Sequence, residues 1–246
     1  MNYIVLDLEF NQDFTSLIDE NINKKYPFEI IQIGAVKLDK NLNVIENFNK
    51  FIKPSIYSKI NPYITDLTGI TTEQLANERP FTLIYDEFIN FIENIDSIIL
   101  IWGTSDIKEL YKNTEYHKLN TKLLPKKFIN IQPFVSLCLG FTTKNLLNLK
   151  HAAESLNIPV KDDFHDALID AMYTAEIFKK IYNPSIQPSV YDETFVKTRK
   201  RTPKVVVDFD GLINQFEKMY SRKMSEEEQE IIKLAYKMGK TSQFIK

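Results

Sequence analysis

The N-terminal run from Tyr3 to Phe10 constrains the fold more than any other segment. It reads Tyr-Ile-Val-Leu-Asp-Leu-Glu-Phe, and such an apolar, β-rich run is typical of a buried central strand. Side chains alternate along a strand, so Asp7 and Glu9 face the same side with Cα atoms roughly 6.5 to 7 Å apart. Unpaired carboxylates inside a protein are costly. We therefore expect this pair to hold a ligand; the alternative is an exposed strand end.

Two further extended runs follow, Glu29 to Leu38 and Val44 to Ile52. The polar stretch between them has the composition of a hairpin turn, which predicts a three-stranded meander. Helical spacing begins at Thr71, with an apolar stripe between Phe81 and Ile92. Strands and helices then alternate, which indicates an α/β fold, a mixed β-sheet flanked by α-helices. The later strands are expected at 97–102 and 128–131, and the later helices at 104–116, 133–139, 144–156 and 166–181.

The composition divides the chain into three parts. We expect the main domain to comprise residues 1–183. Residues 184–207 are expected to be a proline-containing basic linker. Residues 208–246 predict a small C-terminal helical extension, with helices at 208–220 and 225–240. The basic residues of the linker either contact phosphates or are simply solvated; they are Arg199, Lys200, Arg201 and Lys204.

The charge and cysteine content limit the class of protein. A net charge of -2 excludes the strong positive field of a non-specific nucleic-acid coat, so phosphate must be bound locally or through metal ions. The single cysteine, Cys138, cannot form an internal disulfide. Neither a signal peptide nor an apolar run of membrane-spanning length is present. We expect a cytoplasmic protein that does not act at a membrane.

A third acid, Asp106, falls in the first turn of the helix expected after the strand at 97–102. Acids in a first turn often serve only the helix dipole, which is the alternative interpretation. In open α/β sheets, however, ligands gather where strands end and helices begin. We therefore group Asp106 with the two strand acids.

His165 and Asp170 complete the candidate catalytic set. Five residues at about 100° each would put them about 140° apart on one helix. We therefore expect His165 in a loop and Asp170 one turn into a helix that Asp166 caps. The alternatives are a solvated loop histidine and a surface helix acid.

Four carboxylates at one site repel strongly, since two unit charges 4 Å apart interact by about 4 kcal/mol at an effective dielectric constant near 20. Divalent cations remove this repulsion. All-oxygen ligands suit Mg²⁺ or Mn²⁺, and two such ions about 3.5 to 4 Å apart can bind the attacking and leaving oxygens of a phosphodiester. A nearby histidine is suited to take a proton from the attacking water near neutral pH.

These residues resemble, in order and setting, the motifs of the DEDDh 3′→5′ exonuclease superfamily, with the branch of the histone-mRNA 3′ exonuclease and its bacterial relatives as the nearest likeness. The likeness covers about residues 1–183, and the similar runs are 6–10, 29–36, 67–71, 102–106 and 165–170. It implies a ribonuclease H-like fold.

The resemblance also implies a role for each catalytic residue. By it, Asp7 bridges two metal ions, and Glu9 and Asp170 help to hold the catalytic ion. Asp106 supports the second ion, and His165 is the general base.

The same resemblance assigns contacts with the terminal nucleotide to Phe10, Asn11, Thr68, Gly69 and Ile70. Phe10 and Ile70 could equally be core residues. Trp102 either stacks on a base, a contact worth about 1 to 3 kcal/mol in single-strand binders, or packs at a strand end.

The expected function is removal of nucleotides from single-stranded 3′ ends, with RNA slightly favoured over DNA and nucleoside monophosphates as products. Discrimination between RNA and DNA depends on recognition of the 2′-hydroxyl, which no sequence feature reveals. The alternative is a catalytically silent scaffold of the same fold that binds nucleic acid or protein. All five expected catalytic positions are intact, which argues against the scaffold. The sequence does not specify a protein partner for the C-terminal helices.

Overall fold

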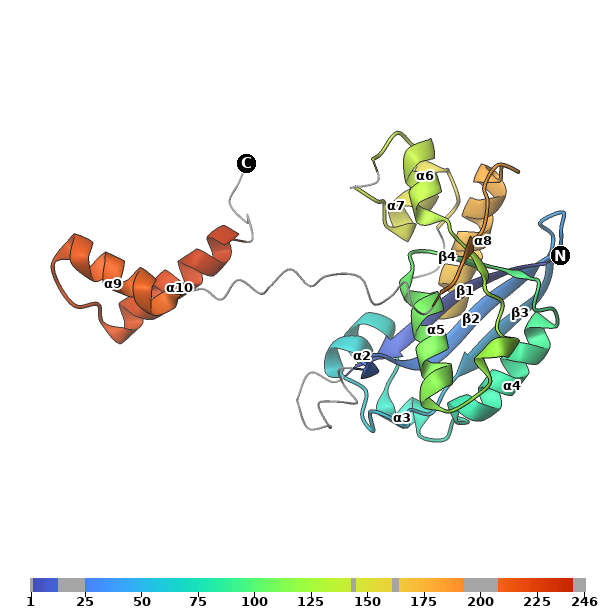
Figure 1. Ribbon diagram of the computed structural model, residues 1–246, viewed down its shortest axis with the longest axis horizontal. Coiled ribbons are helices and arrows are strands. Elements are labelled where there is room, and N and C mark those ends of the chain that lie inside the picture. Colours follow the sequence, from blue (N-terminus) through green and yellow to red (C-terminus); the bar gives the residue numbers. More distant parts are fainter. Residues whose placement is uncertain (1, 13–24, 143–144, 161–163, 193–207, 241–246) are drawn as a thin grey trace. The chain divides into compact units, whose positions relative to one another are not determined.

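The computed structural model describes residues 2–12, 25–142, 145–160, 164–192 and 208–240 (Figure 1). The chain groups into two compact units, residues 1–195 and 196–246. The first unit holds a β-sheet with its helices, and the second holds a pair of helices.

In the described part of the first unit, six strands form one mixed sheet in the order β3-β2-β1-β4-β5-β6. The strands are β1 (Tyr3–Asn11), β2 (Glu29–Leu38), β3 (Val44–Phe51), β4 (Ile98–Ile101), β5 (Lys127–Asn130) and β6 (Ser189–Val190). The first three are antiparallel neighbours, which confirms the meander. β4 and β5 continue the sheet in parallel with β1. The N-terminal run is therefore an interior strand, as predicted.

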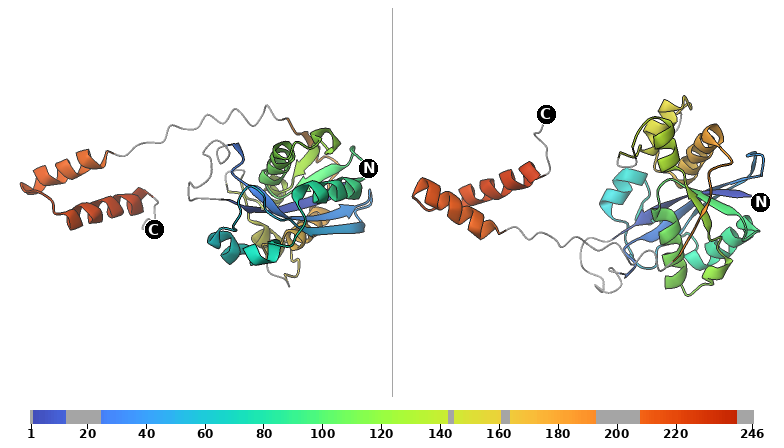
Figure 2. Two further views of the ribbon diagram at one scale, coloured as in Figure 1. Left: turned by 90° about the horizontal axis from the view of Figure 1, so that it is seen from below. Right: turned by 45° about the horizontal axis from the view of Figure 1, so that its top comes forward.

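Helices cover both faces of this sheet (Figure 2). They are α2 (Pro62–Thr68), α3 (Thr72–Leu75), α4 (Phe81–Ile92), α5 (Ser105–Tyr116), α6 (Gln132–Cys138), α7 (Leu149–Ser155) and α8 (Ala167–Ile181), with a short 3-10 helix at Thr121–Leu123. α7 begins later than predicted, because the Asn148 side chain caps it by accepting the N–H of His151 at 2.8 Å. α2 was not predicted, although Asn61 at its N-cap and Pro62 in its first turn are start signals.

The region predicted as a linker does not begin at residue 184. Ser189 and Val190 form β6, which pairs antiparallel with β5. The ring of Tyr191 stacks on that of Tyr111 with centroids 4.2 Å apart. Residues 184–192 therefore belong to the first unit, and the basic run of the linker lies outside the described residues.

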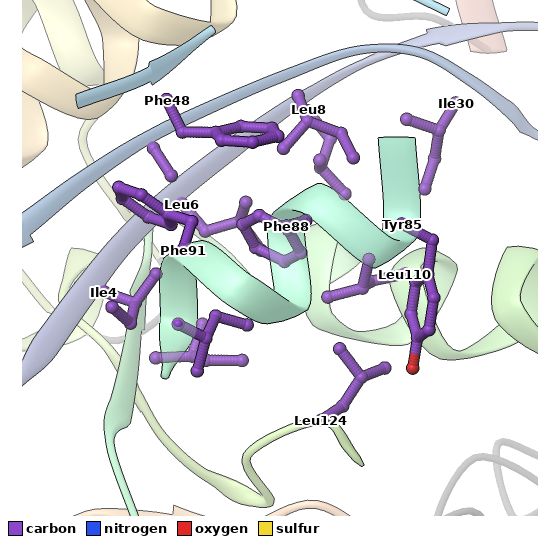
Figure 3. Close-up of a cluster of buried hydrophobic side chains, with 14 of the residues drawn as sticks. Ile4, Leu6, Leu8, Ile30, Phe48, Tyr85, Phe88, Phe91, Leu110 and Leu124 are labelled. Carbon is purple, nitrogen blue, oxygen red and sulfur yellow. The ribbon is translucent and has the colours of Figure 1, made fainter. Parts of the chain in front are cut away.

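β1 divides its side chains between two cores, because alternate residues face opposite sides of a sheet. Ile4, Leu6 and Leu8 belong to the core that α4 and α5 cover (Figure 3). Tyr3 and Val5 belong to the core that α8 covers. Asp7 and Glu9 continue the second set, so alternation directs both acids to the α8 side of the sheet.

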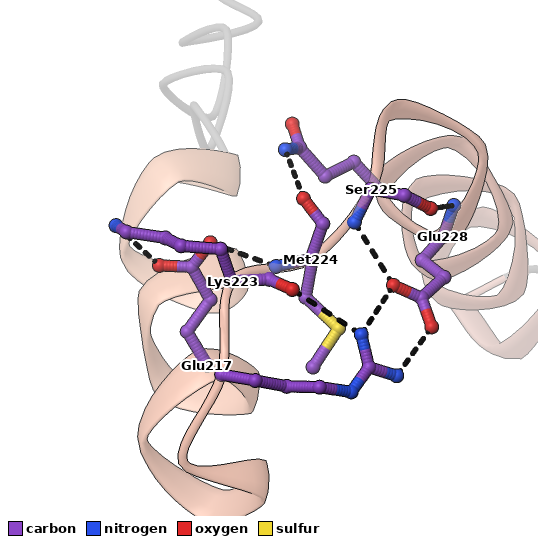
Figure 4. Close-up of polar contacts among 7 residues, drawn as sticks. Glu217, Lys223, Met224, Ser225 and Glu228 are labelled. Atoms are coloured by element: carbon purple, nitrogen blue, oxygen red, sulfur yellow. Dashed lines mark hydrogen bonds and ion pairs between the residues drawn. The ribbon is translucent and has the colours of Figure 1, made fainter.

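The second unit is a helical hairpin of α9 (Phe209–Tyr220) and α10 (Glu226–Lys240). Its turn is held by polar contacts (Figure 4). The N–H of Ser225 donates to Glu228 Oε2 at 2.9 Å, and the N–H of Glu228 donates to Ser225 Oγ at 3.3 Å. This is a capping box, and it confirms that the last helix starts at Ser225. Arg222 also donates to the Glu228 carboxylate, at 2.8 Å.

In the parts of both units that the structure describes, no helix has the length and apolar character needed to cross a membrane.

Candidate active site

The last residues of β1 bring Glu9 beside His165 and Asp170. One potential ligand atom from each of these side chains lies within 4.8 Å of the other two. Asp106 lies near enough for its charge to raise the pKa values of Asp7 and Glu9, and the pKa of Asp7 also responds to the charges of Glu9 and Asp170. The structure thus gathers Glu9, His165 and Asp170 within ligand distance of one another, and places Asp7 and Asp106 near these acids.

Burial and like charges raise the pKa of both strand acids. The pKa of Asp7 lies well above its ordinary value, first because the carboxyl is buried and then because Asp106, Asp170 and Glu9 carry like charges. Burial, followed by the charges of Asp170 and Asp106, raises the pKa of Glu9 to about 8. Mutual shifts of this kind arise when carboxylates share one site.

The turn between β4 and α5 places Asp106. Gly103 adopts φ +96°, which glycine tolerates best, and its N–H donates to Asn130 Oδ1 at 2.9 Å. Asp106 follows in the first turn of α5 and is 6% exposed. Burial raises the pKa of Asp106 to about 7, and hydrogen bonds from its own N–H and that of Leu8 oppose the rise. Thr104 stands at the N-cap, and its side chain makes no cap hydrogen bond.

The first turn of α8 places Asp170. Asp166 caps this helix, as predicted, by accepting the N–H groups of Leu168 and Ile169 at 3.0 and 3.1 Å. Asp170 Oδ2 accepts the backbone N–H of His165 at 3.2 Å. Burial raises the pKa of Asp170 to about 6, and that hydrogen bond opposes the rise.

The close approach of α8 to the sheet depends on Gly34, which pairs with Asp7 across β1 and β2. A Cβ atom at Gly34 would lie 2.0 Å from the carbonyl carbon of Ala167 and 2.1 Å from the backbone nitrogen of Leu168. Only glycine fits there. Small residues thus let the helix pack tightly enough to carry Asp170 to the strand acids.

His165 lies in the loop before α8, as the helical-wheel argument predicted. Its side chain is exposed, and its backbone has φ +77°, which is uncommon for a residue other than glycine. The exposed ring lies at the side of the acid cluster that water can reach.

The donor set fits a hard divalent cation. Asp170 Oδ1 is buried and has no hydrogen-bond partner in the described part of the protein, and such an atom is costly unless something binds it. Burial and like charges raise the pKa values of Glu9 and Asp106, so a nearby cation would favour the ionised form of both carboxyls. Oxygen ligands of this kind suit Mg²⁺ or Mn²⁺. Asp7, Glu9, Asp106 and Asp170 could hold such ions.

Two of the predicted nucleotide contacts are buried. Asn11 is 0% exposed, and its amide bridges the C=O of Lys59 and the N–H of Asn61 at 2.9 and 3.0 Å. This occupancy favours a positioning role for Asn11. Ile70 is 3% exposed within an apolar cluster, which favours its interpretation as a core residue.

The other predicted contacts are more accessible. Gly69 is exposed and ends α2 with φ +73°. Thr68 is half-buried, and its hydroxyl donates to the C=O of Ile64 at 2.8 Å. Phe10 and Trp102 are half-buried and pack against the two cores, so part of each side chain remains accessible.

Sequence reasoning missed two features of the site. Asp166 was predicted only as a cap, but its charge also raises the pKa of Asp7, Glu9 and Asp170. Gln32 is buried on β2 and donates to Asp166 at 2.8 Å. The sequence places Gln32 in the run 29–36 that resembles the exonuclease superfamily. It does not reveal that Gln32 bonds to a residue 134 positions further along the chain.

Acids from an interior strand and two flanking helices, with a histidine beside them, form an arrangement that suits metal-dependent phosphodiester chemistry. The chain belongs to the exonuclease family, since the family model described as RNase_T, Exonuclease, matches residues 4–178. These residues therefore form an exonuclease domain, and the predicted resemblance to the DEDDh 3′→5′ exonucleases is confirmed.

Two curated relatives illustrate the family. The PolC-type DNA polymerase III of Thermotoga petrophila is 30% identical over 183 residues, which cover 72% of this chain and 11% of the relative. The chain thus spans about a tenth of that relative's length. The probable 3′-5′ exonuclease KapD of Bacillus subtilis is 26% identical over 184 residues, which cover 72% of this chain and 83% of the relative.

Solved structures confirm the ribonuclease H-like fold. The nuclease domain of 3′hExo, a DEDDh family member bound to rAMP, gives a TM-score of 0.64 at 19% identity, covering 78% of this chain and 96% of that one. Cell-death related nuclease 4 gives 0.63 at 19% identity, covering 77% and 66%.

Proposed function

We propose that this protein removes nucleotides from single-stranded 3′ ends, with RNA slightly favoured over DNA, and releases nucleoside monophosphates. The observation that carries the proposal is the convergence of four acids and one histidine, in which burial and like charges raise the pKa values of the acids. Such repulsion persists in a fold when the site has to hold positive charge.

The four acids would hold two divalent cations, Mg²⁺ or Mn²⁺. Asp7 would serve both ions, Glu9 and Asp170 would hold the catalytic ion, and Asp106 would support the second. Bound ions supply the positive charge that polarises the phosphodiester and stabilises the attacking and leaving oxygens. The buried, unpartnered Oδ1 of Asp170 supports its place among the ligands.

His165 is the general base. It takes a proton from the attacking water, a contribution typically worth about 10²- to 10⁴-fold in rate. Its exposed ring beside Glu9 and Asp170 supports this role, because the water can reach it directly. The hydrogen bond from its backbone to Asp170 at 3.2 Å keeps the base in place beside a metal ligand.

The 3′ end of the substrate contacts β1, the C-terminal end of α2 and the turn after β4. Gly69 provides accessible backbone beside Thr68, whose hydroxyl is held by Ile64 and Ile70, and the exposed parts of Phe10 and Trp102 provide ring surfaces on which a base can stack. Asn11 and Ile70 are buried and support this surface through their packing and hydrogen bonds without touching the nucleotide. RNA is favoured because the 3′hExo nuclease domain is described with rAMP, whereas the PolC-type relatives make DNA the competing substrate.

The test uses 5′-labelled single-stranded RNA and DNA of one sequence, with Mg²⁺, Mn²⁺ or chelator. The expected result is a ladder that shortens from the 3′ end, faster on RNA, and that disappears with chelator or in Asp7→Asn. Asp86→Asn, an exposed acid on α4, is the matched control and keeps full activity. Undiminished activity in Asp7→Asn would contradict the mechanism, and inactivity on every substrate would favour the silent scaffold.

A further inference from the structure

Gln32 is a fully buried polar side chain next to the candidate active site. It is 0% exposed on β2 and lies opposite Glu9 in the register of β1 and β2. Its Nε2 donates to Asp166 Oδ2 at 2.8 Å and to Asn49 Oδ1 at 3.0 Å. Its Oε1 accepts the N–H of Ala167 at 3.3 Å.

These three bonds fix the direction of the amide. A carboxamide offers two N–H donors and one oxygen acceptor, and here both donors meet side-chain oxygens while the acceptor meets an N–H. A flipped Gln32 would place its oxygen against the Asp166 carboxylate. Neither an apolar side chain nor a carboxylate at this position can make the same set of contacts.

The two residues that Gln32 binds on the α8 side follow His165 directly in the chain. Asp166 is also the N-cap of α8, and Asp170 lies one turn later. His165 itself has φ +77°, a conformation that persists only where neighbouring contacts hold it. The hydrogen bonds of the Gln32 amide therefore hold the loop that carries His165, and the start of α8, against the sheet beside Glu9.

We propose that Gln32 is a positioning residue. Its hydrogen bonds with Asp166 and Ala167 keep His165 and Asp170 in place beside Glu9. The proposal rests on the function proposed above, in which His165 is the base. It goes further because the strand that carries Gln32 contributes no ligand or base of its own. Asn49 on β3 completes the arrangement by binding the second amide donor.

A purely structural role for Gln32 is the competing explanation, and Asn113 provides the matched control. Asn113 is 1% exposed and also makes three buried amide hydrogen bonds, to the backbone groups of Phe28, Ile30 and Glu109. None of these partners is one of the five catalytic residues. Asn113→Leu therefore removes a comparable set of bonds from the core without touching the His165 loop.

The kinetic test compares Gln32→Met, which keeps the side-chain length, with Asn113→Leu, at a temperature where both are folded by circular dichroism. Gln32→Met should lower kcat about 10- to 100-fold, as expected when a catalytic group is misplaced by about 1 Å, and leave KM within about threefold. In a His165→Asn background the same change should lower kcat by a smaller factor than in the parent, because only the placement of Asp170 is then left to disturb. An unchanged kcat in Gln32→Met, equal losses in both backgrounds, or an equal loss in Asn113→Leu would overturn the proposal.

A second readout needs no activity and separates this proposal from the proposed function. The chain has three histidines, so their ring signals are resolvable by NMR in the metal-free protein. Gln32→Met should shift or broaden the His165 signal and leave those of His117 and His151 in place. An unmoved His165 signal would overturn the positioning role, even if the parent protein proved to be inactive. Conversely, a moved signal in an inactive protein would sustain the positioning role while the proposed function fails.

Discussion

His165 and Asp170 are joined through the backbone of one and the side chain of the other. The His165 N–H donates to Asp170 Oδ2 at 3.2 Å, so the bond does not use the imidazole ring. One carboxylate thereby orients the loop with one oxygen, while its other oxygen, the buried Oδ1, has no hydrogen-bond partner among the described residues. In the proposed function, metal binding and base placement would thus be coupled in a single side chain.

Replacing the ring should separate these two roles. His165→Asn keeps the backbone donor, and asparagine tolerates positive φ better than most residues. We expect kcat to fall about 10²- to 10⁴-fold while Mn²⁺ affinity, measured by titration calorimetry, stays within about threefold. A large loss of Mn²⁺ affinity with a small loss of kcat would reverse the assignment.

The metal-free protein should lose stability as the pH rises. Burial, aided by like charges, raises the pKa values of Glu9 and Asp106 to about 8 and about 7, whereas carboxyls in an unfolded chain titrate near pH 4. The folded state therefore binds protons that the unfolded state releases. The resulting contribution to the free energy of unfolding is complete below about pH 4 and is lost as the pH rises to about 8. Urea unfolding in chelator between pH 4 and 9 measures this, and a flat or rising profile would contradict it.

Neutralising one acid should stabilise the metal-free fold. At a pH high enough to ionise these acids, Asp7→Asn removes a charge that Asp106, Asp170 and Glu9 repel. In chelator the melting temperature should rise, by about 2 to 4 °C for each kcal/mol of relieved repulsion, whereas Asp86→Asn should leave it unchanged. In excess Mn²⁺ the parent protein should have the higher melting temperature, because ion binding stabilises it more than it stabilises Asp7→Asn. A melting temperature in chelator that falls in Asp7→Asn would count against a shared acidic site.

The contact between α8 and β2 should tolerate no added methyl group. Gly34→Ala places a Cβ 2.0 Å from the Ala167 carbonyl carbon, and overpacking of this kind costs about 1 to 3 kcal/mol or more. Activity should fall as well, since α8 carries Asp170. Gly140→Ala is the control, because a Cβ built there meets no atom within 4 Å among the described residues beyond its chain neighbours, and only its positive φ is strained, which costs about 1 to 2 kcal/mol. Equal losses of unfolding free energy and activity in both variants would contradict the close-packing account.

The features that sequence predicted best are those encoded by local periodicity. Alternation along residues 3–10 gave the common face of Asp7 and Glu9, and the angle per helical residue separated His165 from the helix of Asp170. Capping chemistry placed the starts of α8 and α10 at Asp166 and Ser225. Each of these follows from neighbours within a few positions.

The features that sequence could not supply depend on register and on contacts between distant segments. The pairing of Glu9 with Gln32 requires the β1–β2 register, and the bond from Gln32 to Asp166 requires the packing of α8 on β2. The resemblance assigned Asn11 a contact with the nucleotide, but its side chain is fully buried and donates to the C=O of Lys59. In such cases a residue type alone does not distinguish a ligand contact from a structural hydrogen bond.

The central claim, that these four acids hold two divalent cations, is tested most directly by anomalous scattering from crystals grown with Mn²⁺. We predict two manganese peaks, both in contact with Asp7, with Asp170 Oδ1 bound to one and Asp106 beside the other. No bound manganese, or manganese only at acids elsewhere on the surface, would contradict the account.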